Sequence, residues 1–150
     1  MIKTEERFET FTVLISKISR NIRKIKNNEM SNYSLRSTHI SCLYYLYKTE
    51  ELTATELCER CEEDKATVSR TLDFLEKNGY LFCETKSAKR YKSPFVLTEK
   101  GLKTAKEIAE KIDRALETVS VGLSENERKE FYRCLRIISN NLEKLSEGEG

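Results

Sequence analysis

Residues that break helices are scarce in this sequence, as are histidine and tryptophan. Its 150 residues include one proline, five glycines, one histidine and no tryptophan. Because proline and glycine end helices and shape turns, their scarcity favours a helix-rich chain over a sandwich of short strands. Charged residues make up 35% of the chain and hydrophobic residues 38%, a balance that fits a folded domain better than a disordered one. We expect one mainly α domain with a folded core.

Signals that would send the chain to or across a membrane are also missing. No stretch approaches the roughly 18 apolar residues of a membrane span. Residues 1–6 carry two acids and no apolar run, unlike a secretory signal. The five cysteines are odd in number and scattered, which is typical of reduced thiols. The chain is therefore expected to be cytoplasmic.

An enzyme is not expected either. The single histidine leaves no convincing Ser/His/Asp or Cys/His set, and the sequence has no Gly-rich phosphate loop and no paired metal motif. We therefore predict no catalytic residues, no cofactor and no metal site.

The spacing of apolar residues predicts long helices towards both ends of the chain. Apolar residues recur every three or four positions within residues 8–25, 102–119 and 131–145, and a shorter run covers residues 35–47. The long stripes are more than a short central unit can cover. Pairing between two copies of the chain, a homodimer, is the physical expectation.

Capping signals divide the middle of the chain into two short helices. Thr53-Ala-Thr-Glu56 is a capping box and opens a helix that runs to about Cys61. After a tight turn, Asp64 is a good N-cap for a helix through Asn78, and Gly79 supplies the left-handed residue that ends it.

A β-hairpin is expected directly after these helices. Residues 80–85 read as a strand and residues 95–97 as its return. The predicted fold class is mainly α with a small β-hairpin, a winged helix-turn-helix. We expect a single chain, 1–150, with this unit at 35–101 and dimerisation helices at 1–34 and 102–150.

Two short helices, a tight turn and a basic hairpin form a shape that docks on DNA, with the second helix in the major groove. Val68, Leu72 and Leu75 keep one face of that helix for packing. Its first turns offer short donors, a methyl group and two cations, which suit base edges and phosphates. The residues predicted to contact DNA from this helix are Lys65, Ala66, Thr67, Ser69 and Arg70. An ordinary amphipathic helix with a polar outer face is the alternative.

The hairpin loop places four cations within seven residues and no acid among them: Lys86, Lys89, Arg90 and Lys92. Such a loop can reach the minor groove, whose negative potential attracts Arg and Lys. A solvated loop that is basic by chance is the alternative. Double-stranded DNA is the predicted partner.

Four runs of this sequence resemble the signature of the MarR (multiple antibiotic resistance regulator) family. They are Thr53-Ala-Thr-Glu-Leu-Cys58, Lys65-Ala-Thr-Val-Ser-Arg-Thr-Leu-Asp73, Leu75-Glu-Lys-Asn-Gly79 and Leu97-Thr-Glu-Lys-Gly101. The resemblance implies a triangular homodimer with the terminal helices at its interface. It also implies recognition helices in successive major grooves of a pseudopalindrome, and often release of DNA by a ligand. The chain is accordingly expected to be a transcription regulator, a ligand-responsive repressor.

The wing departs from the family's pattern. Members commonly carry an Asp shortly before a wing Arg, whereas this loop reads Ser87-Ala-Lys-Arg90. Arg90 is the candidate for the side chain inserted into the minor groove, and Lys89 is the alternative.

Two groups of residues are candidates for regulatory sites. Cys58 and Cys61 form a C-x-x-C on a predicted helix, which is either structural or a redox pair; zinc would need about four ligands. The peroxide-sensing branch of the resembled family uses a first-helix cysteine that this chain lacks. His39, Tyr44 and Tyr47 either fill the junction beside the DNA-binding unit or line a pocket for a small aromatic effector.

Two other functions remain open from the sequence. One is a winged-helix module that binds a protein partner, and the other is a thiol-based redox-sensing regulator. The salt dependence of affinity distinguishes the first from DNA binding, because only neutralised phosphates make log affinity fall steeply with log salt concentration.

Overall fold

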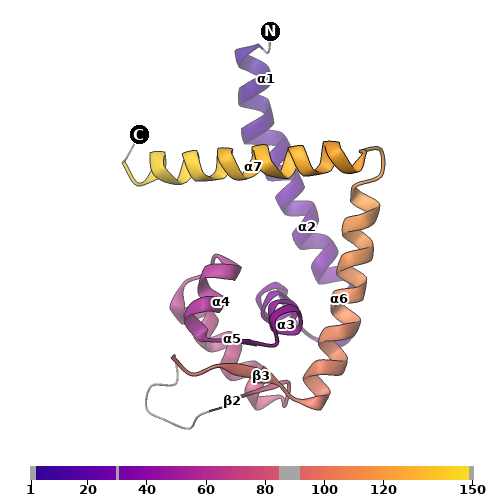
Figure 1. Ribbon diagram of the computed structural model, residues 1–150, viewed down its shortest axis with the longest axis vertical. Coiled ribbons are helices and arrows are strands. Elements are labelled where there is room, and N and C mark those ends of the chain that lie inside the picture. Colours follow the sequence, from indigo (N-terminus) through magenta and orange to yellow (C-terminus); the bar gives the residue numbers. More distant parts are fainter. Residues whose placement is uncertain (1–2, 30, 85–91, 149–150) are drawn as a thin grey trace. The chain divides into compact units, whose positions relative to one another are not determined.

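The computed structural model describes residues 3–29, 31–84 and 92–148. The chain forms two compact units, Met1–Ile112 and Asp113–Gly150. The helical elements are α1 (Thr4–Glu9), η1 (Thr10–Leu14), α2 (Ile15–Glu29), η2 (Ser31–Tyr33), α3 (Ser37–Thr49), α4 (Ala54–Cys61), α5 (Lys65–Lys77), α6 (Glu99–Val119) and α7 (Glu125–Ser146). The strands are β1 (Glu51–Leu52), β2 (Leu81–Cys83) and β3 (Phe95–Leu97) (Figure 1). The predicted fold class, mainly α with a small sheet, is confirmed.

The first predicted helix is present but contains a π turn. The elements α1, η1 and α2 run on without a break, and η1 is the π-helical stretch. The hydroxyls of Thr10 and Thr12 donate to the carbonyl oxygens of Glu6 and Phe8, each over 2.7 Å. Side-chain bonds of this kind compete with the helical ladder. Of the described side chains in these three elements, none is buried.

The helix-turn-helix forms where the capping signals predicted it. At the start of α4, the Glu56 amide donates to Thr53 Oγ1 over 3.2 Å, and the Thr53 amide donates to Glu56 Oε1 over 3.0 Å. Asp64 caps α5 by accepting from the Thr67 amide over 2.7 Å. Between them Glu62 takes a left-handed conformation, φ 53°, which turns the chain from one helix into the next.

The end of α5 is a Schellman motif. Gly79 has φ 79°, and the Tyr80 amide donates to the Leu75 carbonyl over 2.9 Å. Thr98 ties this end to the start of α6: its hydroxyl donates to the Gly79 carbonyl over 2.6 Å and accepts from the Gly101 amide over 3.0 Å. The turn after α5 and the first turn of α6 are thus held together by backbone partners.

The wing belongs to a three-stranded antiparallel sheet of order β1-β3-β2. Leu81 pairs with Leu97 and Cys83 with Phe95. The described strand β2 is shorter at its start than the predicted strand at residues 80–85, because the Tyr80 amide closes the end of α5. Strand β1, which pairs Leu52 with Phe95, was not predicted.

The core of the first unit surrounds α3. Leu43 and Leu46 of this helix are fully buried, and they belong to one cluster with Leu57 of α4, Leu75 of α5 and Phe95 of β3. Figure 1 shows α3 enclosed by α4, α5 and the sheet. Ala105 and Ile108 of α6 complete the cluster. Because α4 and α5 are packed into this shared core, the helix-turn-helix is held rigidly in place.

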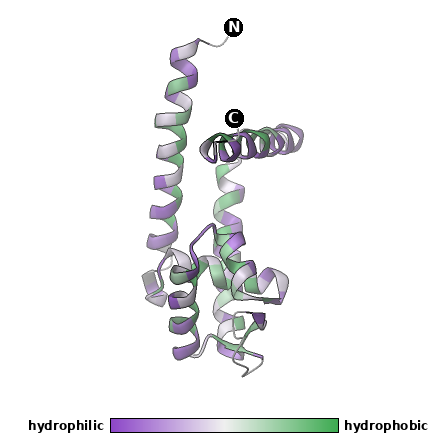
Figure 2. Ribbon diagram, turned by 90° about the vertical axis from the view of Figure 1, so that its left-hand side faces the viewer, coloured by the Kyte–Doolittle hydropathy of each residue, from purple (hydrophilic) through white to green (hydrophobic). Residues whose placement is uncertain are grey.

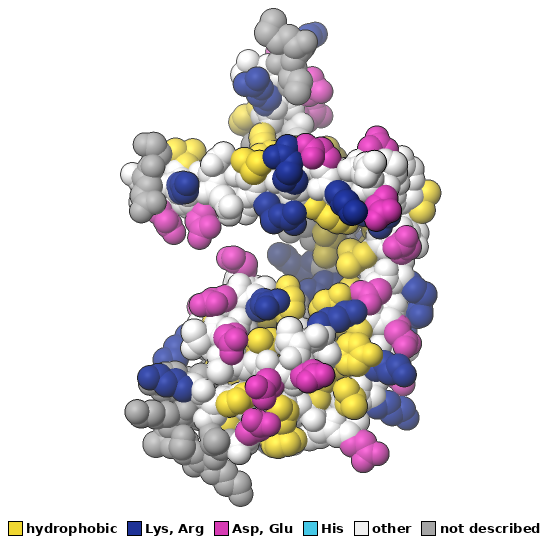
Figure 3. All heavy atoms as spheres, in the orientation of Figure 1, with side chains coloured by type: hydrophobic (Ala, Val, Ile, Leu, Met, Phe, Trp, Pro, Cys, Tyr) yellow, Lys and Arg dark blue, Asp and Glu magenta, His cyan; other side chains and the backbone are white. Residues whose placement is uncertain are grey.

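The second unit holds the end of α6 and the whole of α7. Ser124 and Glu127 form the predicted capping box, with bonds of 2.9 and 3.1 Å between side chain and amide. No residue of α7 is buried, and Phe131, Leu142 and Leu145 are each more than half exposed. Figure 3 shows hydrophobic side chains at the surface along this helix. In the described ranges, no helix has both the length and the apolar character needed to cross a membrane.

Candidate nucleic-acid interface

Helix α5 has one buried face and one exposed face. Val68, Thr71, Leu72 and Leu75 are buried against the core. The predicted contact residues lie on the other side: Lys65, Ala66, Ser69 and Arg70 are exposed, and Thr67 is half-buried. The structure therefore brings all five predicted residues of α5 to one outward surface. We call this surface, residues 65–67, 69 and 70, the reading face.

Polar groups at the start of α5 fix the reading face. The Thr67 amide binds the Asp64 carboxylate, and this bond is the main reason that the pKa of Asp64 lies below its usual value. The Thr67 hydroxyl accepts from Arg70 Nη2 over 3.3 Å. The Arg70 guanidinium is thus positioned over the first turn of the helix while its side chain stays exposed.

The described part of the wing contains one of its four predicted cations. Lys92 is exposed beside strand β3. Lys86, Lys89 and Arg90 lie outside the described residues. The Glu84 amide donates to the Pro94 carbonyl over 3.0 Å, so strand pairing extends one residue beyond β2 on the side that leads into the loop.

His39 links α3 to α5. Its Nδ1 accepts from the Arg36 amide over 3.0 Å, and its ring stacks on Phe74 of α5 with 4.3 Å between centroids. Burial, and then the charge of Arg36, hold the pKa of His39 below its ordinary value. The imidazole is therefore a neutral acceptor with a structural contact, and nothing in this geometry requires a ligand.

Tyr44 and Tyr47 both lie near Lys48 of the same helix. Lys48 Nζ lies 5.4 Å from the Tyr44 ring centroid and 6.0 Å from that of Tyr47. Both tyrosines are half-buried, and Tyr47 packs against the core cluster. The structure does not bring His39 to these rings through any of its described contacts, so the proposed effector pocket stays a prediction.

The cysteines show a pairing that the sequence did not indicate. None of the described cysteines is in a disulfide. Cys61 of α4 lies opposite Cys42 of α3, with 4.0 Å between the two sulfur atoms. Burial raises the pKa of Cys58, the other member of the predicted C-x-x-C. A sequence separation of 19 residues leaves no local signal for the Cys42 contact.

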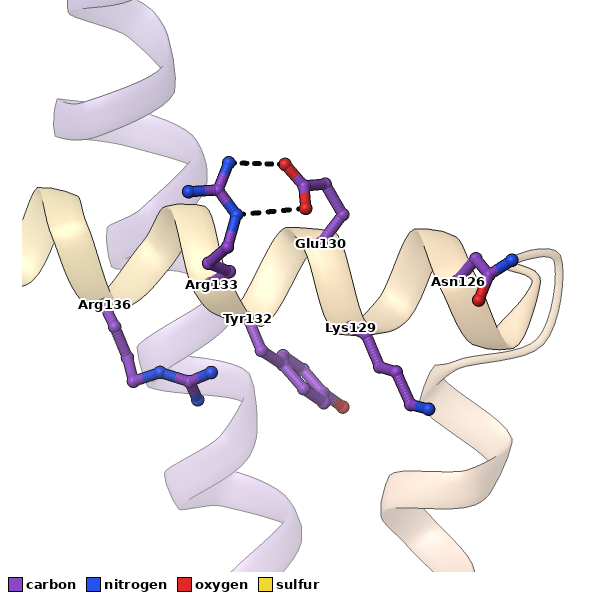
Figure 4. Close-up of a pocket in the computed structure, with 6 residues that line it drawn as sticks. All are labelled: Asn126, Lys129, Glu130, Tyr132, Arg133 and Arg136. Atoms are coloured by element: carbon purple, nitrogen blue, oxygen red, sulfur yellow. Dashed lines mark hydrogen bonds and ion pairs between the residues drawn. The ribbon is translucent and has the colours of Figure 1, made fainter.

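A shallow hollow on α7 is lined by polar and charged side chains, three of them cations. Its lining residues are Asn126, Lys129, Glu130, Tyr132, Arg133 and Arg136 (Figure 4). Arg133 is held by Glu130, with 3.0 Å between Nε and Oε2. Lys129, Tyr132 and Arg136 point to the side away from this pair. Across the described residues, no group of three or more His, Cys, Asp or Glu side chains could hold a metal ion.

Two short helices joined by a turn, followed by an antiparallel hairpin, define the chain as a winged helix-turn-helix protein. The sequence profile of the MarR family matches residues 33–90, which include the whole helix-turn-helix. A Bacillus subtilis (strain 168) protein described as the uncharacterized HTH-type transcriptional regulator YwoH is 28% identical over 123 residues, 82% of this chain and 89% of that protein.

Solved structures of MarR family proteins share the fold of this chain. NMB1585, a MarR family regulator from Neisseria meningitidis, has a TM-score of 0.83 at 19% identity and covers 96% of this chain and 99% of its own. MepR of S. aureus in complex with DNA has a TM-score of 0.78 at 21% identity, covering 93% and 99%. The chain is thus similar to MarR family transcription regulators in its helix-turn-helix sequence and in its fold, and the resemblance of its motifs is confirmed.

Proposed function

We propose that this protein binds double-stranded DNA as a homodimer and represses transcription from a pseudopalindromic operator. The observation that carries the proposal is the reading face of α5. A rigid helix start that offers two cations, two hydroxyls and a methyl group matches the groups presented by base edges and phosphates in the major groove. The structure of the relative MepR with DNA supports this partner.

Each side chain of the reading face has a chemical role in this proposal. The Arg70 guanidinium can donate two bonds to a guanine edge, which is the commonest specific contact in protein–DNA complexes. Lys65 at the first helical position is placed for a phosphate, where the helix dipole adds to its charge. The Ala66 methyl suits a thymine methyl, and the hydroxyls of Thr67 and Ser69 suit either an edge or a phosphate.

Exposed apolar residues support the dimer. Phe8, Ile18 and Ile22 on the N-terminal helix keep 69, 48 and 48% of their surface exposed, and Leu142 and Leu145 on α7 keep 52 and 65%. Figure 2 shows hydrophobic and hydrophilic faces along the N-terminal helix. Burying the exposed half of one such side chain contributes about 1 kcal/mol. A two-fold interface counts every residue twice, so ten such residues a chain would contribute on the order of 20 kcal/mol before the costs of association.

A two-fold dimer sets the form of its operator. Two identical reading faces related by a two-fold axis need two inverted half-sites. Recognition helices in successive major grooves place the half-site centres about 10 bp apart. A dimer bound there would exclude other proteins from the same DNA, which is how repression is proposed to occur.

Control by a small aromatic effector is the second part of the proposal. The half-buried rings of Tyr44 and Tyr47 on α3 offer stacking surfaces beside the helix-turn-helix. A ligand that binds them in one arrangement of the chain only would shift the affinity for DNA. Isothermal titration with simple aromatic carboxylates, on the wild type and on Tyr47→Ala, tests this directly.

The test of DNA binding is a salt series. A dimer that neutralises about eight phosphates should lose affinity for duplex DNA with a slope of log affinity against log salt near −7. Replacing Lys89, Arg90 and Lys92 by alanine should flatten the slope by about two to three. An unchanged slope in this variant would remove the wing from the contact.

A control variant separates local contact from total charge. Lys129, Arg136 and Lys144 of α7 carry the same charge as the three wing cations, and their replacement by alanine should leave the slope unchanged. A shallow slope for the wild type, together with capture of a protein partner that random duplex cannot displace, would favour the protein-interaction module.

A further inference from the structure

Three side chains from different helices meet behind the turn of the helix-turn-helix. Cys42 of α3 is completely buried, and its Sγ lies 4.0 Å from Sγ of Cys61, the last residue of α4. Lys26 of α2 is half-buried beside them, with its Nζ donating to Ser41 Oγ over 2.9 Å. The Cys42–Cys61 pair is thus in sulfur–sulfur contact next to a cation.

The electrostatics give the two thiols different roles. The contact with Cys42 lowers the pKa of Cys61; burial opposes this shift, and the charge of Lys26 supports it. The same contact, and then burial, raise the pKa of Cys42. Cys61 is only half-buried, whereas Cys42 is fully buried, so solvent and oxidants reach Cys61 first. Because the thiolate is the nucleophile, we take Cys61 as the reactive member of the pair and Cys42 as its resolving partner.

We propose that Cys42 and Cys61 form a reversible disulfide that controls the position of the recognition helix. A disulfide needs a sulfur–sulfur bond of about 2.05 Å, so the two sulfur atoms have to approach by about 2 Å from their 4.0 Å contact. The alternative partner of Cys61 is Cys58, three residues earlier on α4. Side chains at this helical spacing are about 5–6 Å apart at Cβ, beyond the roughly 4 Å of a disulfide.

The oxidant is a hydroperoxide, and the chemistry takes two steps. The Cys61 thiolate attacks the peroxide, so that a sulfur–oxygen bond forms and the oxygen–oxygen bond breaks; the alkoxide takes a solvent proton and leaves as an alcohol, or as water from hydrogen peroxide. Cys61 is then a sulfenic acid. Cys42 loses its proton and attacks the Cys61 sulfur, a disulfide forms, and the hydroxide released takes that proton as water.

The location of the pair connects oxidation to DNA binding. Cys61 ends α4, and only residues 62–64 separate it from the first residue of α5. The Glu63 amide bonds back to the Cys58 carbonyl over 3.2 Å, and Asp64 caps α5, so the turn is tightly tied at both ends. Pulling Cys61 towards α3 therefore displaces the start of the reading face. Oxidation weakens DNA binding in this proposal.

Peptide mapping tests the disulfide without any use of DNA. Purified wild type and Cys58→Ser are treated with hydrogen peroxide, the remaining thiols are blocked with iodoacetamide, and the protein is cut with trypsin. Trypsin cuts after Arg36, Lys48, Arg60 and Lys65, so Cys42, Cys58 and Cys61 fall on three separate peptides, 37–48, 49–60 and 61–65. We expect peptides 37–48 and 61–65 to be linked in both proteins. Linkage through 49–60 instead, or three blocked thiols in the wild type, would overturn the proposal.

Single-cysteine variants test the order of the two steps. In Cys42→Ala, the Cys61 sulfenic acid has no partner, and dimedone should trap it. In Cys61→Ser no dimedone adduct should form at residue 42. An adduct on Cys42 and none on Cys61 would reverse the roles and refute this mechanism. Since Cys42 lies in the core, the wild-type mapping stands as the test should its alanine variant not fold.

The effect on DNA is measured separately, because this arm rests on the proposed function. Oxidised wild type should bind its duplex about tenfold more weakly than reduced protein, dithiothreitol should restore binding, and Cys61→Ser should be insensitive to peroxide. A mapped disulfide with unchanged affinity would refute the control of the recognition helix. Failure of the reduced protein to bind DNA would refute the proposed function, while the mapping would still decide whether the disulfide forms.

Discussion

Gly101 offers the sharpest test of how the wing is joined to the rest of the domain. A Cβ atom at this position would lie 1.7 Å from the Tyr80 carbonyl oxygen and 2.7 Å from its carbonyl carbon. Both are backbone atoms, so no side-chain rotation can relieve the contact. We predict that Gly101→Ala forces the first turn of α6 away from the turn that ends α5.

The size of the effect follows from this distance. Real Cβ contacts are essentially never shorter than 3.0 Å, so the two backbones must separate by about 1.3 Å. That shift also strains the Thr98 hydroxyl bonds of 2.6 and 3.0 Å to Gly79 and Gly101. Overpacking that side chains can partly absorb costs 1–3 kcal/mol. For a backbone collision we expect at least about 3 kcal/mol, which lowers Tm by about 10 °C in a chain of this size.

Thermal melts followed by circular dichroism measure this loss, with Gly122→Ala as control. Gly122 has φ +99°, and a Cβ atom there would have no heavy atom within 4 Å, so only its backbone conformation is strained. That substitution should cost about 1 kcal/mol. A Gly101→Ala protein that melts at the wild-type temperature, or above Gly122→Ala, would refute the close approach of α6 to Tyr80.

Three further predictions concern binding, assembly and pH. Arg70→Ala should cost about 1–3 kcal/mol in operator affinity and relax preference at one base position, as read from competition with single-base operator variants; an equal loss for all sequences would contradict base reading. Ile18→Asp should shift sedimentation towards the monomer, because it puts a charge on the apolar stripe of the N-terminal helix. The neighbouring Ser19→Asp should leave the dimer intact. If Ile18→Asp still sediments as a dimer, the dimer interface lies elsewhere. Because the pKa of His39 is lowered in the folded state, the unfolded chain takes up its proton first, so the free energy of unfolding should fall as pH drops below about 6.5. Urea melts from pH 5 to 7.5 should show this loss in the wild type and less of it in His39→Gln, and equal slopes would refute it.

Local signals explain why so much of the helix-turn-helix could be predicted from the sequence. Thr53, Asp64 and Ser124 sit at helix starts where one side chain satisfies a nearby amide, and Gly79 sits where φ must be positive. These effects act within four residues. The helix boundaries that depend on them were therefore predicted to within a residue or two.

Features set by tertiary packing were not predicted. Strand β1 has two residues, and its pairing with β3 depends on where α3 ends. In α6 the sequence stripe included Leu102, which is 52% exposed, and missed Ile108, which is fully buried. The core contact of this helix follows Gly101, Ala105, Ile108 and Ala109, because the close approach at Gly101 sets which side faces inward.

The candidate site also has one part that local signals predicted and one part that depends on tertiary packing. The reading face followed from the helix period, since Val68, Leu72 and Leu75 had to face the core. The stacking of His39 on Phe74 joins positions far apart in sequence, as does the contact of Cys42 with Cys61. No spacing rule within one helix could have indicated either pair.

Selection of bound fragments from a random duplex pool tests the central claim, that two copies of α5 read DNA from opposite halves of one site. Purified wild-type protein should enrich an inverted repeat whose half-site centres lie about 10 bp apart. The same selection with Arg70→Ala should return that repeat with one position in each half-site no longer specified. Recovery of unselected sequences by the wild type at low salt, or of a motif without two-fold symmetry, would contradict the account.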